Sequence, residues 1–450
     1  MFRRFPNAVG LALLASCAAL AASSGWSQEI ALRPARAAAE RQPTIDSGPI
    51  GLSPTQESSP TATITISQLE ELAEVHNPTL AQAARQIEAA SGQRLQVGLR
   101  PNPVIGYQVE ELGENGRAGQ HGMFLRQEIV TADKLGLSRE VAAREVQQAE
   151  WDLQVQRQRV RNDVRSRAYD VLAAQQTAEI AAELVRVGQT VVDVAERLQR
   201  ARETSQVDVL QARVEANSAG LQLAAARKAH AAAWRRLAIA VGLPDMQPSQ
   251  LADRLDEDLP EVSWKETSAK LLSQSPQLAR AHAGVERARW AIARACAGRV
   301  PNIETGAAIR YNDDSHDTTL SLQFGVPLMI FDRNQGNLIK AYAELAAAQR
   351  DVERIELVLQ DRLAEVYRDY EVAREQAEQY RRDILPDAKQ ALELTRRGYE
   401  QGEFPYLALL TAQQTFARTN LAYVARLREL WLATVQIQGM LLNGGLELPR

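Results

Sequence analysis

Two long stretches of this chain, residues 134–201 and 335–400, carry an almost uninterrupted helical pattern, with Pro386 as the one proline inside them. At 1.5 Å per residue, a helix of about 68 residues is about 100 Å long, several times the width of an ordinary domain. A single globular core cannot cover such a helix. The chain must therefore pack its helices side by side as long rods.

The chain also repeats itself with a period of about 200 residues, and such a repeat defines the architecture. The landmarks recur in the same order: Asn77-Pro78 as Ser275-Pro276, Pro101-Asn102 as Pro301-Asn302, Gly136 as Gly336, and segment 205–212 as segment 405–412. We therefore predict two structural repeats, residues 67–245 and 264–445, joined by a linker at residues 246–263.

Both repeats have the same predicted order of helix, two strands, long helix and return helix. The first helix of each ends before a Pro-Asn pair that cannot continue it. The predicted first helices are 69–98 and 266–299, the strands are 101–112, 120–130, 301–312 and 317–328, and the return helices are 206–241 and 406–441. The predicted fold class is mainly α with a small β part and an internal duplication.

In the predicted strands the apolar pattern changes from a period of about 3.6 to a period of 2. The clearest apolar series is Leu320, Leu322, Phe324 and Val326, which alternates with polar residues and glycine. Alternating segments of about ten residues are typical of a transmembrane β-barrel, whose apolar side faces lipid. Two hairpins on a soluble core would show a similar pattern, but rods of this length offer no core to receive them. We therefore predict that these four side chains face lipid.

Four strands cannot close a barrel by themselves, and an open sheet edge in hydrocarbon leaves backbone groups unpaired at a cost of several kcal/mol each. Closure must come from other copies of the chain. Two copies would give 8 strands and a barrel filled by its own side chains, whereas three would give 12 strands and a water-filled passage. We favour three.

Composition excludes several classes of function. The net charge is -4 with both signs scattered, which argues against a nucleic-acid partner. The five histidines and two cysteines lack metal-ligand spacing, and no catalytic motif is present, so we expect neither an enzyme nor a bound metal or cofactor. The acidic turn at residues 312–317, which contains His316, also fits a cation site, although such turns are usually only solvated.

The N-terminus resembles a secretory signal. Residues 1–27 combine a basic start with a short apolar run over 9–22, which predicts a signal peptide. Cys17 lies in a segment that also fits a bacterial lipoprotein box, where it would carry the lipid; the alternative is cleavage nearer Ser27, which removes it. Residues 28–62 are rich in Pro, Ser, Thr and Ala without periodicity and are predicted to be a flexible leader.

Residues 67–445 resemble the TolC-type outer membrane efflux proteins. The motifs that carry the resemblance are Asn77-Pro78-x-Leu80, Pro101-Asn102-Pro103, Pro301-Asn302, Val326-Pro327-Leu328, Phe331-Asp332-Arg333-Asn334-x-Gly336 and Val207-Asp208-Val209-Leu210-x-Ala212. In addition, Gln127-Glu128-Ile129 followed by Lys134-Leu135 is similar to the heavy-metal (CzcC-type) branch of that family.

The resemblance implies a homotrimer in the bacterial outer membrane, with a 12-stranded β-barrel that continues into a periplasmic α-barrel of 12 helices. It implies a passive conduit for heavy-metal cations, partnered by a periplasmic adaptor (membrane fusion) protein and an inner-membrane pump of the resistance-nodulation-division class. Two alternatives stay open: a multidrug efflux or type I secretion channel of the same fold, and a soluble periplasmic coiled-coil adaptor.

In this family the tips of the helical hairpins contact the adaptor and form the gate. The resemblance assigns these roles to the segments 202–210 and 402–410, with the candidate residues Arg202, Ser205, Asp208, Leu210, Gly402, Pro405, Leu409 and Leu410. Where some relatives have inward-facing acidic residues, this chain has Ala408 and Thr411. We therefore favour a constriction by Leu409, Leu410 and Asp208, although Asp208 fits a helix N-terminal cap beside Ser205 equally well.

Overall fold

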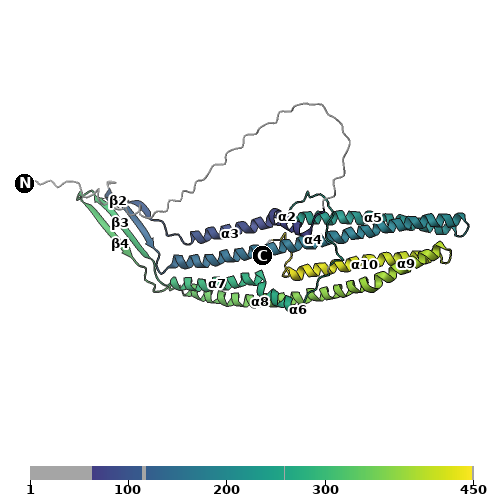
Figure 1. The fold of residues 1–450 in the computed structure, drawn as a ribbon. Coiled ribbons are helices and arrows are strands. Elements are labelled where there is room, and N and C mark those ends of the chain that lie inside the picture. The colour runs from purple at the N-terminus through teal and green to yellow at the C-terminus, as the bar shows by residue number, and fades with distance from the viewer. Residues whose placement is uncertain (1–62, 114–117, 258, 448–450) are drawn as a thin grey trace, which may run out of the picture. The chain divides into compact units, whose positions relative to one another are not determined.

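A computed structural model describes residues 63–113, 118–257 and 259–447, which belong to one compact unit. The predicted fold class is confirmed: the chain is mainly α-helical with one small antiparallel sheet (Figure 1). The predictions for residues 1–62, including Cys17, lie outside the described residues. Among the described helices, none combines the length and the apolar character needed to cross a membrane.

The same order of elements occurs twice. The first series is α2 (Ile66–His76), α3 (Pro78–Gln96), β1 (Val104–Leu112), β2 (Ala118–Ile129), α4 (Lys134–Arg200) and α5 (Gln206–Val241). The second is α6 (Trp264–Gln274), α7 (Pro276–Ala297), β3 (Ile303–Asn312), β4 (Thr318–Gly325), α8 (Gln335–Gln379), the π-helix η1 (Tyr380–Ile384), α9 (Leu385–Glu400) and α10 (Tyr406–Gln438).

The first helix of each series is broken in two, where the sequence predicted a single helix. The breaks fall at Asn77-Pro78 and Ser275-Pro276, where the residue before proline has an extended conformation (ψ 120° and 121°). Proline restricts the preceding residue to extended backbone but suits the first position of a new helix, so α3 and α7 begin at the prolines. The Asn77 amide also donates to the carbonyl of Ala240, 2.8 Å away, which fixes the break against α5.

The long helical pattern of the second series is likewise not uniform. Pro386 lies in the first turn of α9 and cannot donate a backbone hydrogen bond. The preceding turn widens into η1, where the N–H of Leu385 bonds to the carbonyl of Tyr380, five residues back. The sequence identified Pro386 but predicted one helix through it.

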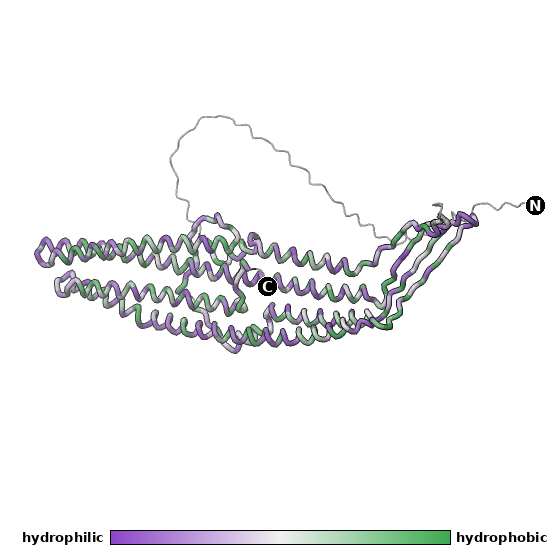
Figure 2. The backbone as a smooth tube through the Cα atoms, turned by 180° about the vertical axis from the view of Figure 1, so that it is seen from behind, coloured by the Kyte–Doolittle hydropathy of each residue, from purple (hydrophilic) through white to green (hydrophobic). Residues whose placement is uncertain are grey.

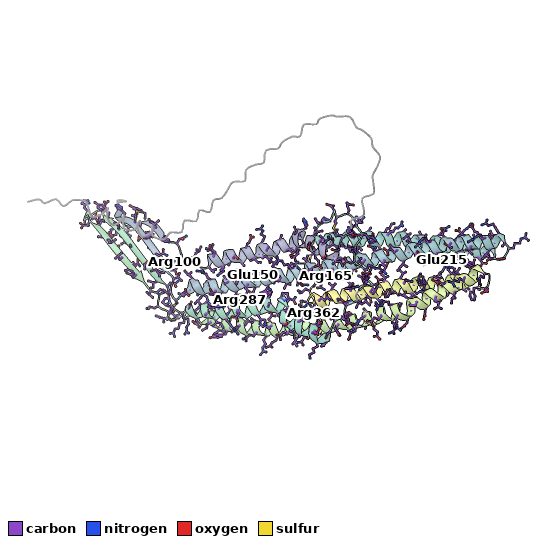
Figure 3. All side chains as sticks on the ribbon, viewed as in Figure 1. Arg100, Glu150, Arg165, Glu215, Arg287 and Arg362 are labelled. Atoms are coloured by element: carbon purple, nitrogen blue, oxygen red, sulfur yellow. The ribbon has the colours of Figure 1, made fainter. Side chains whose placement is uncertain are left out.

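The helices lie along one another and share one main core. α4 packs against α5, α7, α3, α10 and α2, so it joins the two series. One tryptophan on each return helix holds the linker: the indole N–H of Trp234 donates to the carbonyl of Met246, and that of Trp431 donates to the carbonyl of Leu255. Apolar and polar residues alternate along every helix (Figure 2), and charged side chains such as Glu150 and Arg287 line the helices along their length (Figure 3).

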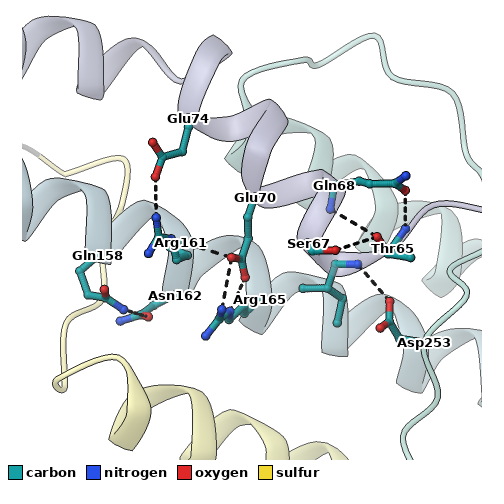
Figure 4. A network of polar contacts seen from close by, with 11 residues as sticks. Thr65, Ser67, Gln68, Glu70, Glu74, Gln158, Arg161, Asn162, Arg165 and Asp253 are labelled. Atoms are coloured by element: carbon teal, nitrogen blue, oxygen red, sulfur yellow. Dashed lines mark hydrogen bonds and ion pairs between the residues drawn. The ribbon is translucent and has the colours of Figure 1, made fainter.

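Ion pairs fasten α2 to α4 (Figure 4). Arg161 pairs with Glu74 at 2.7 Å, and Arg165 pairs with Glu70, whose side chain is only 14% exposed. At the start of α2, Thr65 forms a capping box with Gln68. These contacts hold the first described helix of the chain against its longest one.

Candidate functional site: the sheet and the helical tips

The four strands form one antiparallel sheet in the order β1-β2-β3-β4. β2 and β3 pair directly, so the sheet joins the two series of elements and leaves β1 and β4 as its edges. The register places Met123 opposite both Tyr107 and Ile309, and Ile309 opposite Leu320. Residues directly opposite each other share a face, so these side chains form one row across all four strands.

One face of the sheet is apolar and exposed. Its large apolar side chains are 40–75% exposed and are Ile105, Tyr107, Val109, Met123, Leu125, Ile129, Ile309, Leu320, Leu322 and Phe324. A contiguous apolar surface of this kind marks an interaction surface rather than a free protein surface. Leu320, Leu322 and Phe324 lie on it, whereas Val326 lies just past β4, which ends at Gly325 because Pro327 has no N–H to extend the ladder.

The opposite face of the sheet is mainly polar. Arg310 on β3 forms an ion pair with Glu110 on β1 at 3.2 Å, across the position of Gly122 on β2. Val104 and Phe124 are large apolar exceptions on this face, and the guanidinium of Arg126 lies 4.6 Å from the centre of the Phe124 ring. The sheet is therefore amphipathic across its full width. Sequence reasoning did not single out the Arg310–Glu110 pair or Gly122.

The junction between the sheet and the helices is organised by Asn302. Its side-chain carbonyl accepts from the backbone N–H of Thr131 and from Lys134, and its amide donates to Glu128 at 2.6 Å. Lys134 is buried, and desolvation lowers the pKa of its ammonium group. Glu128 and Lys134 belong to the run that resembles the heavy-metal branch. This junction lines a cavity of about 830 Å³ between α4, α7 and α8.

The acidic turn after β3 does not gather into a metal site. Across residues 63–113, 118–257 and 259–447, no group of three or more His, Cys, Asp and Glu side chains could hold a metal ion. The imidazole Nδ1 of His316 instead lies 3.0 Å from the hydroxyl of Tyr311. The structure therefore brings no set of metal ligands together at this turn.

The two hairpin tips reverse direction by the same backbone motif. After α4, Arg202 has a positive φ of 64°, and the N–H of Glu203 bonds to the carbonyl of Leu198 at 2.9 Å. After α9, Gly402 has a φ of 76°, and the N–H of Glu403 bonds to the carbonyl of Gly398 at 2.8 Å. Both are Schellman motifs, which glycine forms without steric cost. At the left-handed position, the first tip therefore has Arg202, whereas the second has Gly402, the residue that this conformation favours.

The return helices begin differently. Ser205 caps α5, and the Asp208 carboxylate accepts from the Ser205 N–H at 3.1 Å and from the hydroxyls of Thr204 and Ser205. Hydrogen bonds from Thr204 and Ser205 lower the pKa of Asp208. The sequence allows Asp208 to be either part of a constriction or part of a helix cap, and these contacts support the cap. α10 begins after Pro405 without a side-chain cap.

Leu409 does not line a passage. It is fully buried in a cluster that joins the two tips and includes Val209, Tyr399 and Tyr406. The rings of Tyr399 and Tyr406 meet edge to face, with their centres 6.0 Å apart. Packing between the hairpins therefore accounts for Leu409, and its expected part in a constriction is wrong. Leu210 is exposed and Leu410 is half-buried. Sequence reasoning missed Tyr399 and Tyr406, which lie on either side of Gly402 in the sequence and indicate a buried cluster at the tips.

Replacing Arg202 with glycine should slow hydrogen exchange at the Glu203 amide about fivefold, because the left-handed conformation costs a non-glycine residue about 1 kcal/mol. The Gly402→Arg variant is the matched control. An added Cβ at Gly402 meets no atom within 4 Å, so that variant carries the same conformational cost without a clash and should exchange faster at Glu403. Equal exchange in the parent and both variants would contradict this account of the tips.

The comparisons with known proteins agree with this geometry. The family model described as "Outer membrane efflux protein" matches twice, over residues 69–243 and 267–441. This chain belongs to the outer membrane efflux protein family. It is therefore an outer membrane protein that extends into the periplasm, and the prediction that it is not an enzyme is confirmed.

Individual relatives support the same assignment. The chain is 26% identical to the cobalt-zinc-cadmium resistance protein CzcC of Cupriavidus metallidurans, over 84% of this chain and 90% of that protein. Its fold is similar to that of CusC, with a TM-score of 0.71, 17% identity and coverage of 89% and 99% of the two chains. The Vibrio cholerae outer membrane protein VceC has a TM-score of 0.66 and 18% identity, with coverage of 84% and 96%. The resemblance to the CzcC-type efflux proteins is therefore confirmed.

Proposed function

We propose that three copies of this chain form a passive conduit of a tripartite efflux system that releases heavy-metal cations outside the cell. The observation that carries the proposal is the amphipathic sheet, with one wide exposed apolar face, a polar opposite face and two free edges. Four strands cannot form a closed barrel. If β4 of each copy pairs with β1 of the next, three copies give 12 strands that leave no edge unpaired in the hydrocarbon.

The faces of the sheet then have separate roles. The apolar face, including Leu320, Leu322 and Phe324, contacts lipid, and the polar face with Arg310 and Glu110 lines the water-filled lumen. The long helices continue the lumen into the periplasm as an α-barrel. A wet passage conducts solutes without binding them stoichiometrically.

The tips are the proposed contact with a periplasmic adaptor and, through it, with a resistance-nodulation-division pump. The exposed candidates there are Arg202, Ser205, Leu210, Gly402 and Pro405. Leu210 is 52% exposed and Val207, one turn earlier on α5, is 59% exposed, so an apolar partner surface would remove both side chains from water. Leu410 and Asp208 remain as candidates for the constriction of the gate.

The substrate class is supported by similarity to a protein whose name specifies cobalt, zinc and cadmium resistance. Deleting the gene should lower tolerance to these three cations severalfold, and a plasmid copy should restore it. Tolerance to antibiotics and detergents is the control. Loss of drug tolerance with unchanged metal tolerance would favour the multidrug alternative, and release from membranes without detergent would favour the soluble adaptor.

The proposal extends to the N-terminus. Residues 1–27 would then act as a signal peptide, and Cys17 would be either lipidated or removed with the signal. The mass of the mature N-terminus distinguishes these outcomes. A mature chain that begins at Cys17 with an added lipid mass shows a lipoprotein, and one that begins beyond Cys17 excludes it.

A further inference from the structure

The apolar stripe of β4 continues past the end of the strand. Its alternate positions are all 53–80% exposed and are Leu320, Leu322, Phe324, Val326, Leu328 and Ile330. Phe331 follows and is 91% exposed, more than any other large apolar side chain in the part of the chain that the structure describes. The segment 326–331 is therefore an apolar extension of the sheet's exposed face. It lies outside the strand ladder, which stops at Gly325.

The backbone of segment 326–331 lies outside the sheet, so its polar groups have few partners within the described chain. The N–H of Ile330 bonds to the carbonyl of Leu328, and the Gln335 side chain bonds to the carbonyl of Phe331. Unpaired backbone facing lipid does not occur within the hydrocarbon of a membrane. The boundary between hydrocarbon and water suits such a segment, because the apolar side chains can contact hydrocarbon there while water bonds to the backbone.

The residues that follow carry charge. Asp332 and Arg333 are exposed, and Arg333 has no ion-pair partner among the residues that the structure describes. Only its backbone N–H bonds within the described residues, to the side chain of Gln335 at 2.8 Å. A free guanidinium directly after an apolar segment complements the phosphates of lipid headgroups, since arginine binds phosphate through two parallel hydrogen bonds.

The other end of the apolar face has a matching boundary. The hydroxyl of Tyr107 lies 2.8 Å from His121 Nδ1, and the rings of His121 and Tyr311 meet edge to face with their centres 5.7 Å apart. Tyrosine is typical of membrane–water interfaces because it joins an apolar ring to a polar tip. Thr318 pairs with Tyr311. The eight residues of β4 (Thr318–Gly325), at about 3.4 Å each and a tilt of about 40°, span about 21 Å, so the segment that follows β4 lies at the edge of the apolar band of about 25 Å in such barrels.

We propose that the segment 326–331 is a lipid anchor in the periplasmic leaflet, with Phe331 among the acyl chains and Arg333 at the lipid phosphates. The inference rests on the proposed function, because it requires the apolar face of the sheet to contact lipid. Lipid is the occupant rather than a second copy because the stripe continues the face of the sheet. Pairing with another copy would instead use the backbone edge of β4.

The test places a nitroxide label at single positions of the mature protein in a Cys296→Ser background, in which Cys17, lipidated or removed, offers no free thiol. The positions are reached by Phe331→Cys and Leu328→Cys, with Leu322→Cys as the lipid reference and Arg350→Cys, on a side chain that is 80% exposed on α8, as the water reference. The protein is reconstituted into phosphatidylethanolamine–phosphatidylglycerol vesicles. Collisions of each label with apolar oxygen and with a water-soluble nickel chelate are then measured.

At 331 and 328 we expect an oxygen-to-nickel ratio severalfold above that at 350 and below that at 322. A ratio equal to that at 350 while 322 reports lipid overturns the anchor and leaves the conduit intact. Low access to both reagents at 331 and 328 also overturns it, since the segment is then buried between copies. A water-like ratio at 322 itself overturns the proposed function, and the anchor with it.

Discussion

The Leu322→Arg variant is expected to lose stable assembly in the outer membrane, whereas Ser321→Arg, one residue away, should retain it. Leu322 is 65% exposed on the apolar face and lies opposite Ala307, in the middle of the β3–β4 pairing. An arginine on the lipid face near the membrane midplane costs about 2–4 kcal/mol. A complete protein is stabilised by only about 5–15 kcal/mol, so this loss in each copy is a large one.

The two variants place the same charge on the same strand, but Ser321 points to the polar face, opposite Ala308. The measurement is the yield of detergent-extracted oligomer from the outer membrane fraction, with Phe324→Arg as a repeat of the lipid-face change. Equal yields from Leu322→Arg and Ser321→Arg would show that the two faces do not differ in environment. The proposed orientation of the sheet would then be wrong.

The composition of the sheet's faces could be predicted from the sequence because alternation is a local property. The period-2 pattern alone places Leu320, Leu322 and Phe324 on one side. Pairing between β2 and β3 could not be predicted in the same way, because it joins residues almost 200 positions apart. The row that runs from Tyr107 through Met123 and Ile309 to Leu320 therefore became visible only in the structure.

The helical tips show the same division between local and distant effects. The cap at Ser205 and Asp208 can be predicted from spacing, because both partners lie within one turn. The burial of Leu409 cannot, since it depends on contact with the other hairpin, including Val209. A gate residue proposed from a position in one hairpin is therefore reliable only when the packing partner of that helix face is known.

Breaks in the helices depend on proline, and only part of that effect is local. Asn77 and Ser275 are extended because a proline follows, and this constraint is visible in the sequence. Pro386 could equally have ended its helix. It is accommodated by η1 because α10 packs against α8, η1 and α9 and holds the two helix segments along one path.

The Gly122→Ala variant should separate β2 from β3 and so divide the sheet into two hairpins. A Cβ on Gly122 would lie 1.9 Å from the carbonyl oxygen of Ile309 and 2.7 Å from the Cα of Arg310. Both atoms belong to the backbone of β3, so no side-chain rotation relieves the clash. Overpacking costs about 1–3 kcal/mol, and each ladder hydrogen bond lost inside a membrane adds several kcal/mol.

Gly306→Ala is the matched control, since it adds the same methyl group to the same sheet. The nearest atoms to a Cβ at Gly306 are 3.7 Å away, which is ordinary contact. We expect assembly and hydrogen-exchange protection of the β2 and β3 amides to fall sharply in Gly122→Ala and to stay unchanged in Gly306→Ala. The side chain of Arg310 crosses Gly122 to reach Glu110, so the same methyl group would also obstruct the ion pair. Equal protection in both variants would mean that close approach at Gly122 does not hold the two repeats together.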